Sequence, residues 1–176
     1  GRLGAAYAGL VLLEQGVRWP SETVYERNVL AAHLTPVARV EAGQRLAPLV
    51  HAMTDVSDGL IVELKALTSF GGIGATIWGE QLPIDWATEK VAARFRQNPL
   101  DYALYGGEDY ELLMAVPSSQ AEEAQRLCMQ CGVAITEIGV ISDRLGITLN
   151  VQGQEVAIDD KGVFDHFAVD VPQRQS

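Results

Sequence analysis

Apolar residues along the chain alternate between helical spacing and short extended runs, which predicts helices interleaved with strands. The first fifty residues predict three helices in succession. They are a helix carrying Tyr7, Leu10 and Val11, a second over residues 21–32 with Ser21 as its N-cap, and a third over residues 40–49. Gly1 and Gly4 suggest a tight turn into the first helix, whose N-terminus could cradle a phosphate group.

From residue 50 onward, strands and helices alternate. The predicted strands cover residues 50–54, 73–78, 111–116, 133–141, 147–151 and 155–158. The intervening helices carry Leu60, Ile61, Leu64 and Leu67, span residues 85–96, and run from a cap at Ser118 to a left-handed Gly132. Residues 112–116 are all apolar and suit a strand buried on both faces. We therefore expect one domain of the α/β (α+β) class, with a mixed β-sheet covered by helices.

Composition is that of an ordinary globular domain, with 48% hydrophobic and 20% charged residues among 176. Thirteen basic residues against twenty-three acidic ones give a net charge of −10. This balance argues against a nucleic-acid partner, because neutralising a phosphate backbone directly requires clustered Lys and Arg. The sequence has no apolar run of membrane-spanning length and no signal-peptide pattern, so we expect no membrane association and a cytoplasmic location.

The two cysteines, Cys128 and Cys131, have a C-x-x-C spacing that is also found in redox and zinc sites. They lie on one apolar stripe of a predicted helix, and the sequence contains no second cysteine pair. We therefore interpret them as buried structural thiols.

The stretch Asp55-Val56-Ser57-Asp58-Gly59 places two carboxylates and a hydroxyl where a strand passes into a helix. Asp55 and Ser57 would point to the same face of the strand, and Asp58 would lie at or near the helix N-cap. Oxygen ligands of this kind suit Mg²⁺, which takes one or two carboxylates together with substrate phosphates. The alternative is a capped turn without a metal, and the motif by itself does not decide between them.

A second stretch, Tyr105-Gly106-Gly107-Glu108-Asp109-Tyr110-Glu111-Leu112, sets a glycine pair and acidic residues just before a buried strand. Glycines there let the backbone approach a ligand closely. The alternative is a tight turn with solvated acids. No Walker-type phosphate loop is present, and the contexts of His33, His51 and His166 indicate no catalytic triad.

Five motifs in order resemble the thiamine-monophosphate kinase family. They are G-x-L-G at the start, His33-Leu34-Thr35-Pro36 followed by Arg39, the Asp55–Gly59 stretch with Leu60, Gly106 to Leu112, and Lys161-Gly162-Val163-Phe164-Asp165-His166-Phe167. The resemblance covers essentially the whole chain but only the C-terminal portion of that longer family. D-x-S-D-G also recurs in the wider superfamily of aminoimidazole ribonucleotide synthetase and selenophosphate synthetase, whereas G-G-E-D-Y-E-L with D-H-F is more specific to the kinase.

This resemblance implies transfer of the γ-phosphoryl group of ATP to thiamine phosphate, giving thiamine diphosphate, with Mg²⁺. It implies that Asp55 and Asp58 bind magnesium, that Ser57 contacts ATP, and that Glu108 and Phe164 contact thiamine phosphate. Many relatives carry another aromatic at the position of Phe164, which lacks a hydroxyl and is limited to packing. No catalytic general base is expected, because the acceptor is already a phosphate oxygen.

The resemblance also implies a fold like the C-terminal domain of aminoimidazole ribonucleotide synthetase. Residues 1–176 would then be the single C-terminal domain of a two-domain kinase whose N-terminal domain binds ATP and metal and forms a homodimer. Two alternatives stay open, namely another ATP-dependent synthetase of the same superfamily and an inactive ligand-binding fragment. We expect the chain alone to fold but to show little kinase activity.

Overall fold

The computed structural model describes residues 1–69 and 71–158. The helices in this part of the chain are α1 (Ala5–Glu14), α2 (Val24–Leu34), α3 (Val40–Leu46), α4 (Leu60–Ser69), α5 (Trp86–Arg94), α6 (Pro99–Tyr105) and α7 (Ala121–Gln130). The strands are β1 (Ala52–Val56), β2 (Gly74–Trp78), β3 (Glu111–Ala115), β4 (Gly139–Ser142), β5 (Gly146–Val151) and β6 (Gln154–Ala157). None of these helices is long and apolar enough to cross a membrane.

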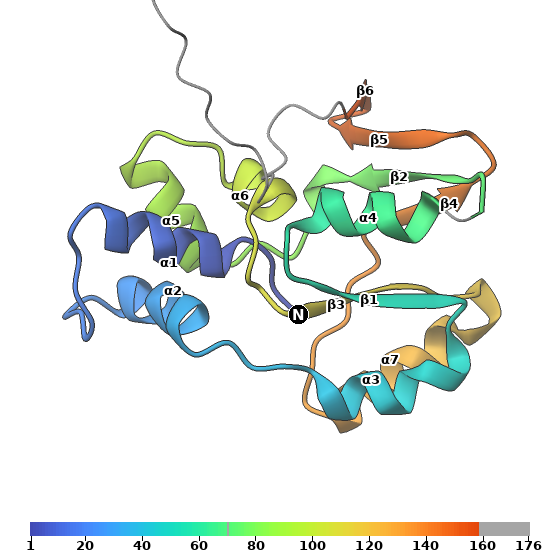
Figure 1. Ribbon diagram of the computed structural model, residues 1–176, viewed down its shortest axis with the longest axis horizontal. Helices are drawn as coiled ribbons and strands as arrows, with labels where there is room; N and C mark the ends of the chain where they lie inside the picture. Colours follow the sequence, from blue (N-terminus) through green and yellow to red (C-terminus); the bar gives the residue numbers. More distant parts are fainter. Residues whose placement is uncertain (70, 159–176) are drawn as a thin grey trace, which may run out of the picture.

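The strands divide between two sheets, as Figure 1 shows. β1 pairs with β3 in an antiparallel ribbon whose register runs from Ala52 opposite Ala115 to Val56 opposite Glu111. The second sheet has the order β4-β2-β5-β6, with β2 parallel to β5 and the other pairs antiparallel. A mixed sheet covered by helices is thus confirmed, while the separate β1–β3 ribbon was not predicted.

The β1–β3 ribbon lies between two apolar clusters (Figure 1). On one side, Leu113 joins α4 and the four-stranded sheet in a core that includes Leu60. On the other side, Leu112 and Met114 pack with α3 and α7. Successive side chains of a strand point to opposite faces, so the apolar run of β3 serves both clusters. The prediction of burial on both faces is confirmed for the face that carries Leu113, whereas Leu112 and Met114 on the other face are partly buried.

Helices α1, α2 and α5 form a third packed unit beside the sheets (Figure 1). Gly9 allows α1 and α2 to approach closely, because a Cβ at Gly9 would lie 2.3 Å from the carbonyl oxygen of Val29 and 2.8 Å from the Cβ of His33. The last turn of α2 is therefore held firmly against α1.

Several predicted boundaries were wrong by a few residues. The third helix ends at Leu46 and passes into a 3₁₀ turn, Ala47–Leu49, because Pro48 has no N–H to continue it. The predicted strand over residues 133–141 is reduced to β4, which begins at Gly139. Ahead of it, the oxygen of Ile138 still accepts a hydrogen bond of 2.8 Å from the N–H of Trp78 at the end of β2, but residues 133–137 belong to no strand of the described part.

Both predicted serine caps were also wrong. Thr23 is the N-cap of α2, and the Ser21 hydroxyl bonds the Glu26 carboxylate instead. Ser118 begins a 3₁₀ turn ahead of α7. The left-handed conformation predicted for Gly132 is confirmed by its φ of 66°.

Candidate functional site

The Asp55–Gly59 and Gly106–Leu112 stretches lie side by side in the fold. The pairing of β1 with β3 continues past the strand ends, because the N–H of Tyr110 donates to the oxygen of Val56 at 2.8 Å and that of Glu108 to the oxygen of Ser57 at 2.7 Å. Two motifs about fifty residues apart in the sequence therefore form one loop cluster.

Glycines make this close approach possible. A Cβ at Gly107 would lie 2.6 Å from the carbonyl oxygen of Ser57, a distance that atoms in contact do not reach. Gly59 has a φ of 104° and faces the backbone of Tyr105. Gly107 is required by the lack of space and Gly59 chiefly by its φ, which is unfavourable for residues with a Cβ. Together the two glycines let the loops approach each other.

The residues predicted to bind Mg²⁺ and ATP lie on the solvent-accessible side of this loop cluster. Asp55 is exposed near the end of β1, while Ser57 and Asp58 are half-buried in the loop that leads to α4. α4 begins at Leu60, so Asp58 is near the helix start, as predicted. Within residues 1–69 and 71–158, no group of three or more His, Cys, Asp and Glu side chains is arranged to hold a metal ion.

A further carboxylate, Glu63, was missed by the sequence reasoning. It is buried in the first turn of α4 and accepts hydrogen bonds from the hydroxyls of Thr54 and Ser57 at 3.3 and 3.4 Å and from the N–H of Asp58 at 3.4 Å. These bonds are long, but they link strand, loop and helix through one side chain. The available signal was an acidic residue in the first turn of the predicted helix, a position where the helix dipole favours negative charge.

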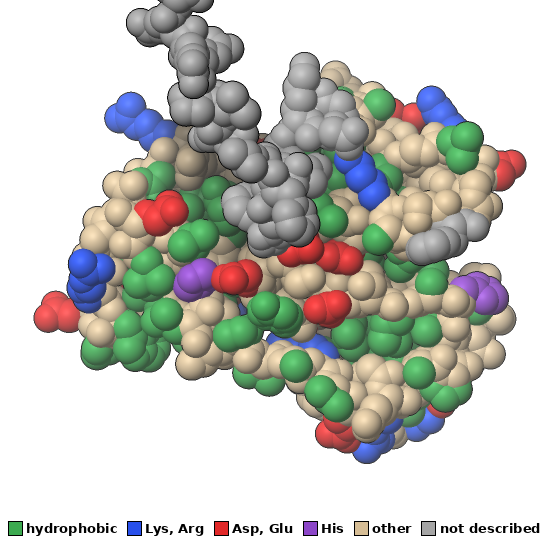
Figure 2. Space-filling view, in the orientation of Figure 1, with side chains coloured by type: hydrophobic (Ala, Val, Ile, Leu, Met, Phe, Trp, Pro, Cys, Tyr) green, Lys and Arg blue, Asp and Glu red, His purple; other side chains and the backbone are tan. Residues whose placement is uncertain are grey.

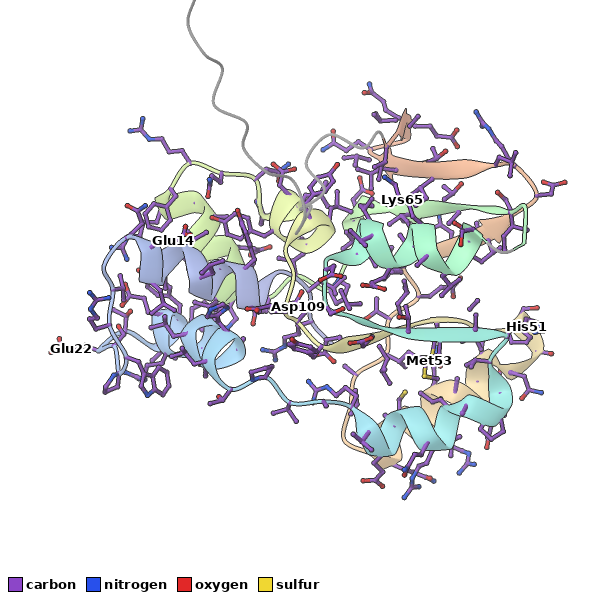
Figure 3. All side chains as sticks on the ribbon, in the orientation of Figure 1. Glu14, Glu22, His51, Met53, Lys65 and Asp109 are labelled. Atoms are coloured by element: carbon purple, nitrogen blue, oxygen red, sulfur yellow. The ribbon has the colours of Figure 1, made fainter. Side chains whose placement is uncertain are left out.

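Asp109 caps the N-terminus of α1. Its carboxylate accepts hydrogen bonds from the N–H groups of Gly4 at 2.6 Å and Ala6 at 3.1 Å, and Figure 3 shows it where the loop before β3 reaches the start of α1. Burial raises the pKa of Asp109 to about 7, although the backbone hydrogen bonds oppose that shift. The predicted phosphate cradle at this helix start is thus already filled by a carboxylate of the protein.

Glu108, predicted to contact the substrate, takes the opposite direction from Asp109. Its backbone has a φ of 68°, and its half-exposed carboxylate lies with Oε2 3.1 Å from Nδ1 of His33 on α2. Tyr110 also has a positive φ, of 50°. Left-handed backbone is unfavourable for residues other than glycine, and such residues concentrate at functional sites. Phe164, the other predicted substrate contact, lies outside the described residues.

A partly buried ion pair, Arg39–Glu111, lies next to the loop cluster. Arg39 donates to Glu111 through Nε at 2.7 Å and Nη2 at 2.8 Å, and the N–H of Arg2 adds a bond of 3.2 Å. Burial is the strongest single influence on the pKa of Glu111 and raises it, but the Arg39 hydrogen bonds, the nearby N-terminal ammonium and the Arg2 N–H together hold that pKa below its usual value. Figure 2 shows acidic side chains gathered in the middle of this face.

Residues 4–152 match the family model described as "AIR synthase related protein, C-terminal domain". The chain belongs to this family. The matched range contains both motifs of the loop cluster, with Asp55, Ser57, Asp58 and Glu108, and ends before Phe164. Membership accounts for the combination of a mixed sheet with covering helices that the structure shows.

The chain is also similar to individual members of this family, both in sequence and in structure. The chain is 35% identical over 173 residues to the thiamine-monophosphate kinase of Salmonella typhimurium (strain LT2). The aligned region covers 96% of this chain and 51% of that relative. A crystal structure of thiamine-monophosphate kinase from Stenotrophomonas maltophilia K279a superposes with a TM-score of 0.78 at 31% identity, covering 89% of this chain and 49% of that one.

A structure of AaThiL complexed with AMPPCP and TMP has a TM-score of 0.72 at 30% identity. It covers 89% of this chain and 47% of that one. The chain therefore spans about half the length of the relatives it matches.

Proposed function

We propose that this chain is the C-terminal half of a kinase that transfers the γ-phosphoryl group of ATP to thiamine phosphate, giving thiamine diphosphate. The observation that carries the proposal is the loop cluster, in which the Glu108 N–H bonds the Ser57 oxygen at 2.7 Å and joins the predicted substrate-binding and nucleotide-binding stretches. The similarity to thiamine-monophosphate kinases, one of them complexed with AMPPCP and TMP, supports the same substrates for this protein.

In this proposal Asp55 and Asp58 bind Mg²⁺, and their side chains suit that ion. Mg²⁺ prefers oxygen donors and commonly takes one or two carboxylates, keeping its other positions for water and substrate phosphates. Asp55 is exposed and Asp58 half-buried, so the carboxylate pair borders solvent, where nucleotide phosphates would arrive. When bound, the metal neutralises the charge on the phosphates. Since the described part holds no complete acidic cluster, we propose that further ligands come from an N-terminal domain.

The other residues of the cluster bind and orient the substrates. Ser57 contacts ATP from the loop that its backbone bond to Glu108 holds in place. Glu108 contacts thiamine phosphate, and Phe164 packs against it. Phosphoryl transfer requires positioning and charge neutralisation more than covalent participation by the protein, so no general base is needed. We also propose that the full-length enzyme is cytoplasmic and forms a homodimer.

The test is formation of thiamine diphosphate by the full-length protein with ATP, thiamine phosphate and Mg²⁺. Asp55→Ala and Asp58→Ala should each lower kcat/KM about 100-fold or more and raise the Mg²⁺ concentration needed for half-maximal rate, because metal-ion charge stabilisation is worth several kcal/mol. Asp143→Ala is the matched control, since Asp143 is an exposed aspartate in the loop between β4 and β5, away from the cluster. Wild-type turnover in both variants would contradict the metal-ligand assignment.

The same assay separates the alternatives. Turnover with an aminoimidazole precursor or selenide in place of thiamine phosphate would favour another synthetase of the superfamily. Comparable turnover by residues 1–176 alone would contradict the proposal that an N-terminal domain completes the site.

A further inference from the structure

His33 and Glu108 come from elements that are distant in the sequence but meet at the edge of the loop cluster. His33 is in the last turn of α2, and Glu108 is in the loop between α6 and β3. Their Nδ1 and Oε2 atoms lie 3.1 Å apart, with the histidine side chain 16% exposed and the glutamate side chain 54% exposed. A buried nitrogen thus faces a carboxylate that is open to solvent.

The histidine is the fixed member of this pair. α2 is held against α1 at Gly9, where a Cβ would come within 2.8 Å of the Cβ of His33. Nδ1 is shielded from solvent and has no well-aligned hydrogen bond to any residue that the structure describes. The Glu108 carboxylate is its nearby charged neighbour, at ion-pair distance without hydrogen-bond alignment. Contacts of this kind in ligand-free sites often tighten when substrate binds.

The backbone of Glu108 is held in place, whereas its carboxylate has no ion-pair partner among the described residues other than His33. The N–H of Glu108 bonds the Ser57 oxygen at 2.7 Å, and its φ of 68° directs the side chain away from Asp109 and toward α2. A long exposed glutamate side chain samples several rotamers, and each ligand contact must overcome that entropy. A partner on a rigid helix removes this cost before the substrate arrives.

We propose that His33 is a positioning residue for the thiamine phosphate site. An N–H at Nδ1 of His33 donates to the Glu108 carboxylate and holds it in the one orientation that meets the cationic or amino-bearing part of the substrate. His33 itself does not touch the substrate. This inference rests on the proposed function. It adds a residue of α2 to a site that is otherwise formed by the loops after β1 and before β3.

Three substitutions at His33 test the role, assayed in the full-length protein. Asparagine places an N–H close to the position of Nδ1, glutamine places one close to the position of Nε2, and alanine provides neither. His33→Ala should raise the KM for thiamine phosphate about tenfold, as expected for loss of a hydrogen bond to a charged group. The KM for ATP should stay within about twofold of the wild-type value. His33→Asn should recover most of the loss, and His33→Gln should not.

Two comparisons distinguish positioning from a structural role. In a Glu108→Ala background, His33→Ala should raise the KM no further, because the carboxylate it positions is gone. His51→Ala is the matched control, because His51 is exposed at the far end of β1 from Asp109 (Figure 3). Equal KM changes for both substrates, or additive effects of His33→Ala and Glu108→Ala, would overturn the inference.

A spectroscopic measurement tests the contact without any enzymatic assay. With ¹⁵N-labelled histidine, the Nδ1 resonance of His33, assigned by its loss in His33→Ala, should shift in Glu108→Ala while that of His51 stays unchanged. An unmoved His33 resonance would overturn the inference whatever the activity. Absence of thiamine phosphate turnover by the wild type would contradict the proposed function, whereas normal turnover with an unaffected His33→Ala variant would contradict only the role of His33.

Discussion

The carboxylate of Asp109 accepts a hydrogen bond of 2.6 Å from the N–H of Gly4, across 105 residues of sequence. Together with the bond from Ala6, it provides α1 with the acceptor that a helix N-terminus requires. The loop before β3 is thereby attached to the three-helix unit as well as to the loop after β1. A displacement of α1 would consequently also move the loop before β3, which forms part of the candidate site.

Asp109 should make stability depend on pH. Its pKa of about 7 in the folded chain lies above the ordinary value of 3.8, so between these values the folded state binds the proton more tightly than the unfolded state. The contribution of Asp109 to the free energy of unfolding therefore falls as pH rises from about 4 to about 7, and it is constant outside that window. Asp109→Asn keeps an acceptor oxygen without the charge.

Urea unfolding of the wild type and Asp109→Asn at several pH values measures this effect. Subtracting the free energy of unfolding of the variant from that of the wild type at each pH removes the contributions of the other carboxylates. As pH rises from about 4 to about 7, the wild type should lose stability relative to the variant. A difference that is independent of pH would contradict the prediction.

Arg39→Ala should destabilise the chain by about 2–4 kcal/mol, because it leaves the buried Glu111 carboxylate without its cation. Arg45→Ala provides the matched control. Arg45 forms an exposed pair with Glu41, also at 2.7 Å, and pairs of that kind contribute less than about 1 kcal/mol. Equal losses in the two variants would show that burial of the Glu111 carboxylate has no special effect.

Gly107→Ala should separate the two loops of the candidate site, since the added Cβ would lie 2.6 Å from the Ser57 oxygen. The expected loss is about 1–3 kcal/mol of stability, together with a raised KM for thiamine phosphate in the full-length protein. Gly43→Ala on α3 is the control, because its Cβ would meet Leu112 at an ordinary 3.5 Å. That variant should be neutral or slightly more stable. Unchanged stability and KM in Gly107→Ala would refute the close-contact argument.

The two cysteines should differ in reactivity. Cys128 is buried in the cluster between α3 and α7, and burial raises the pKa of its thiol, whereas Cys131 is only half-buried. Because the thiolate is the reacting form, iodoacetamide should modify Cys131 roughly tenfold faster than Cys128. Peptide mass spectrometry over time measures both rates, and Cys131→Ser should leave the slow rate unchanged. Faster modification of Cys128 would contradict its burial in the native chain.

Local pattern was sufficient to predict much of the fold. The continuous apolar run of β3 indicated burial on both faces, and the helical spacing after Gly59 indicated α4. The same patterns failed at boundaries such as Ser21 and Ser118, where several polar residues compete for a capping position and tertiary contacts select among them. Division of the strands into two sheets also lay beyond local pattern, because strand pairing depends on every element packed around it.

Motif chemistry likewise identified the loops of the candidate site but not the direction of each side chain. Glu108 and Asp109 are adjacent acids, yet one faces His33 on α2 and the other caps α1. That divergence depends on left-handed backbone at Glu108 and Tyr110, which no residue preference predicts for glutamate or tyrosine.

The sequence by itself determined which stretches supply the candidate site, namely the Asp-rich and Gly-Gly-Glu-Asp stretches, and the order in which they occur. Tertiary structure alone decided how they meet: the Glu108–Ser57 backbone bond, the Arg39–Glu111 pair and the His33–Glu108 contact each join residues about fifty or more positions apart. The physical reason is one of range. Periodicity, capping and turn preferences act over a few residues, whereas these contacts form only when helices and strands pack together as a whole.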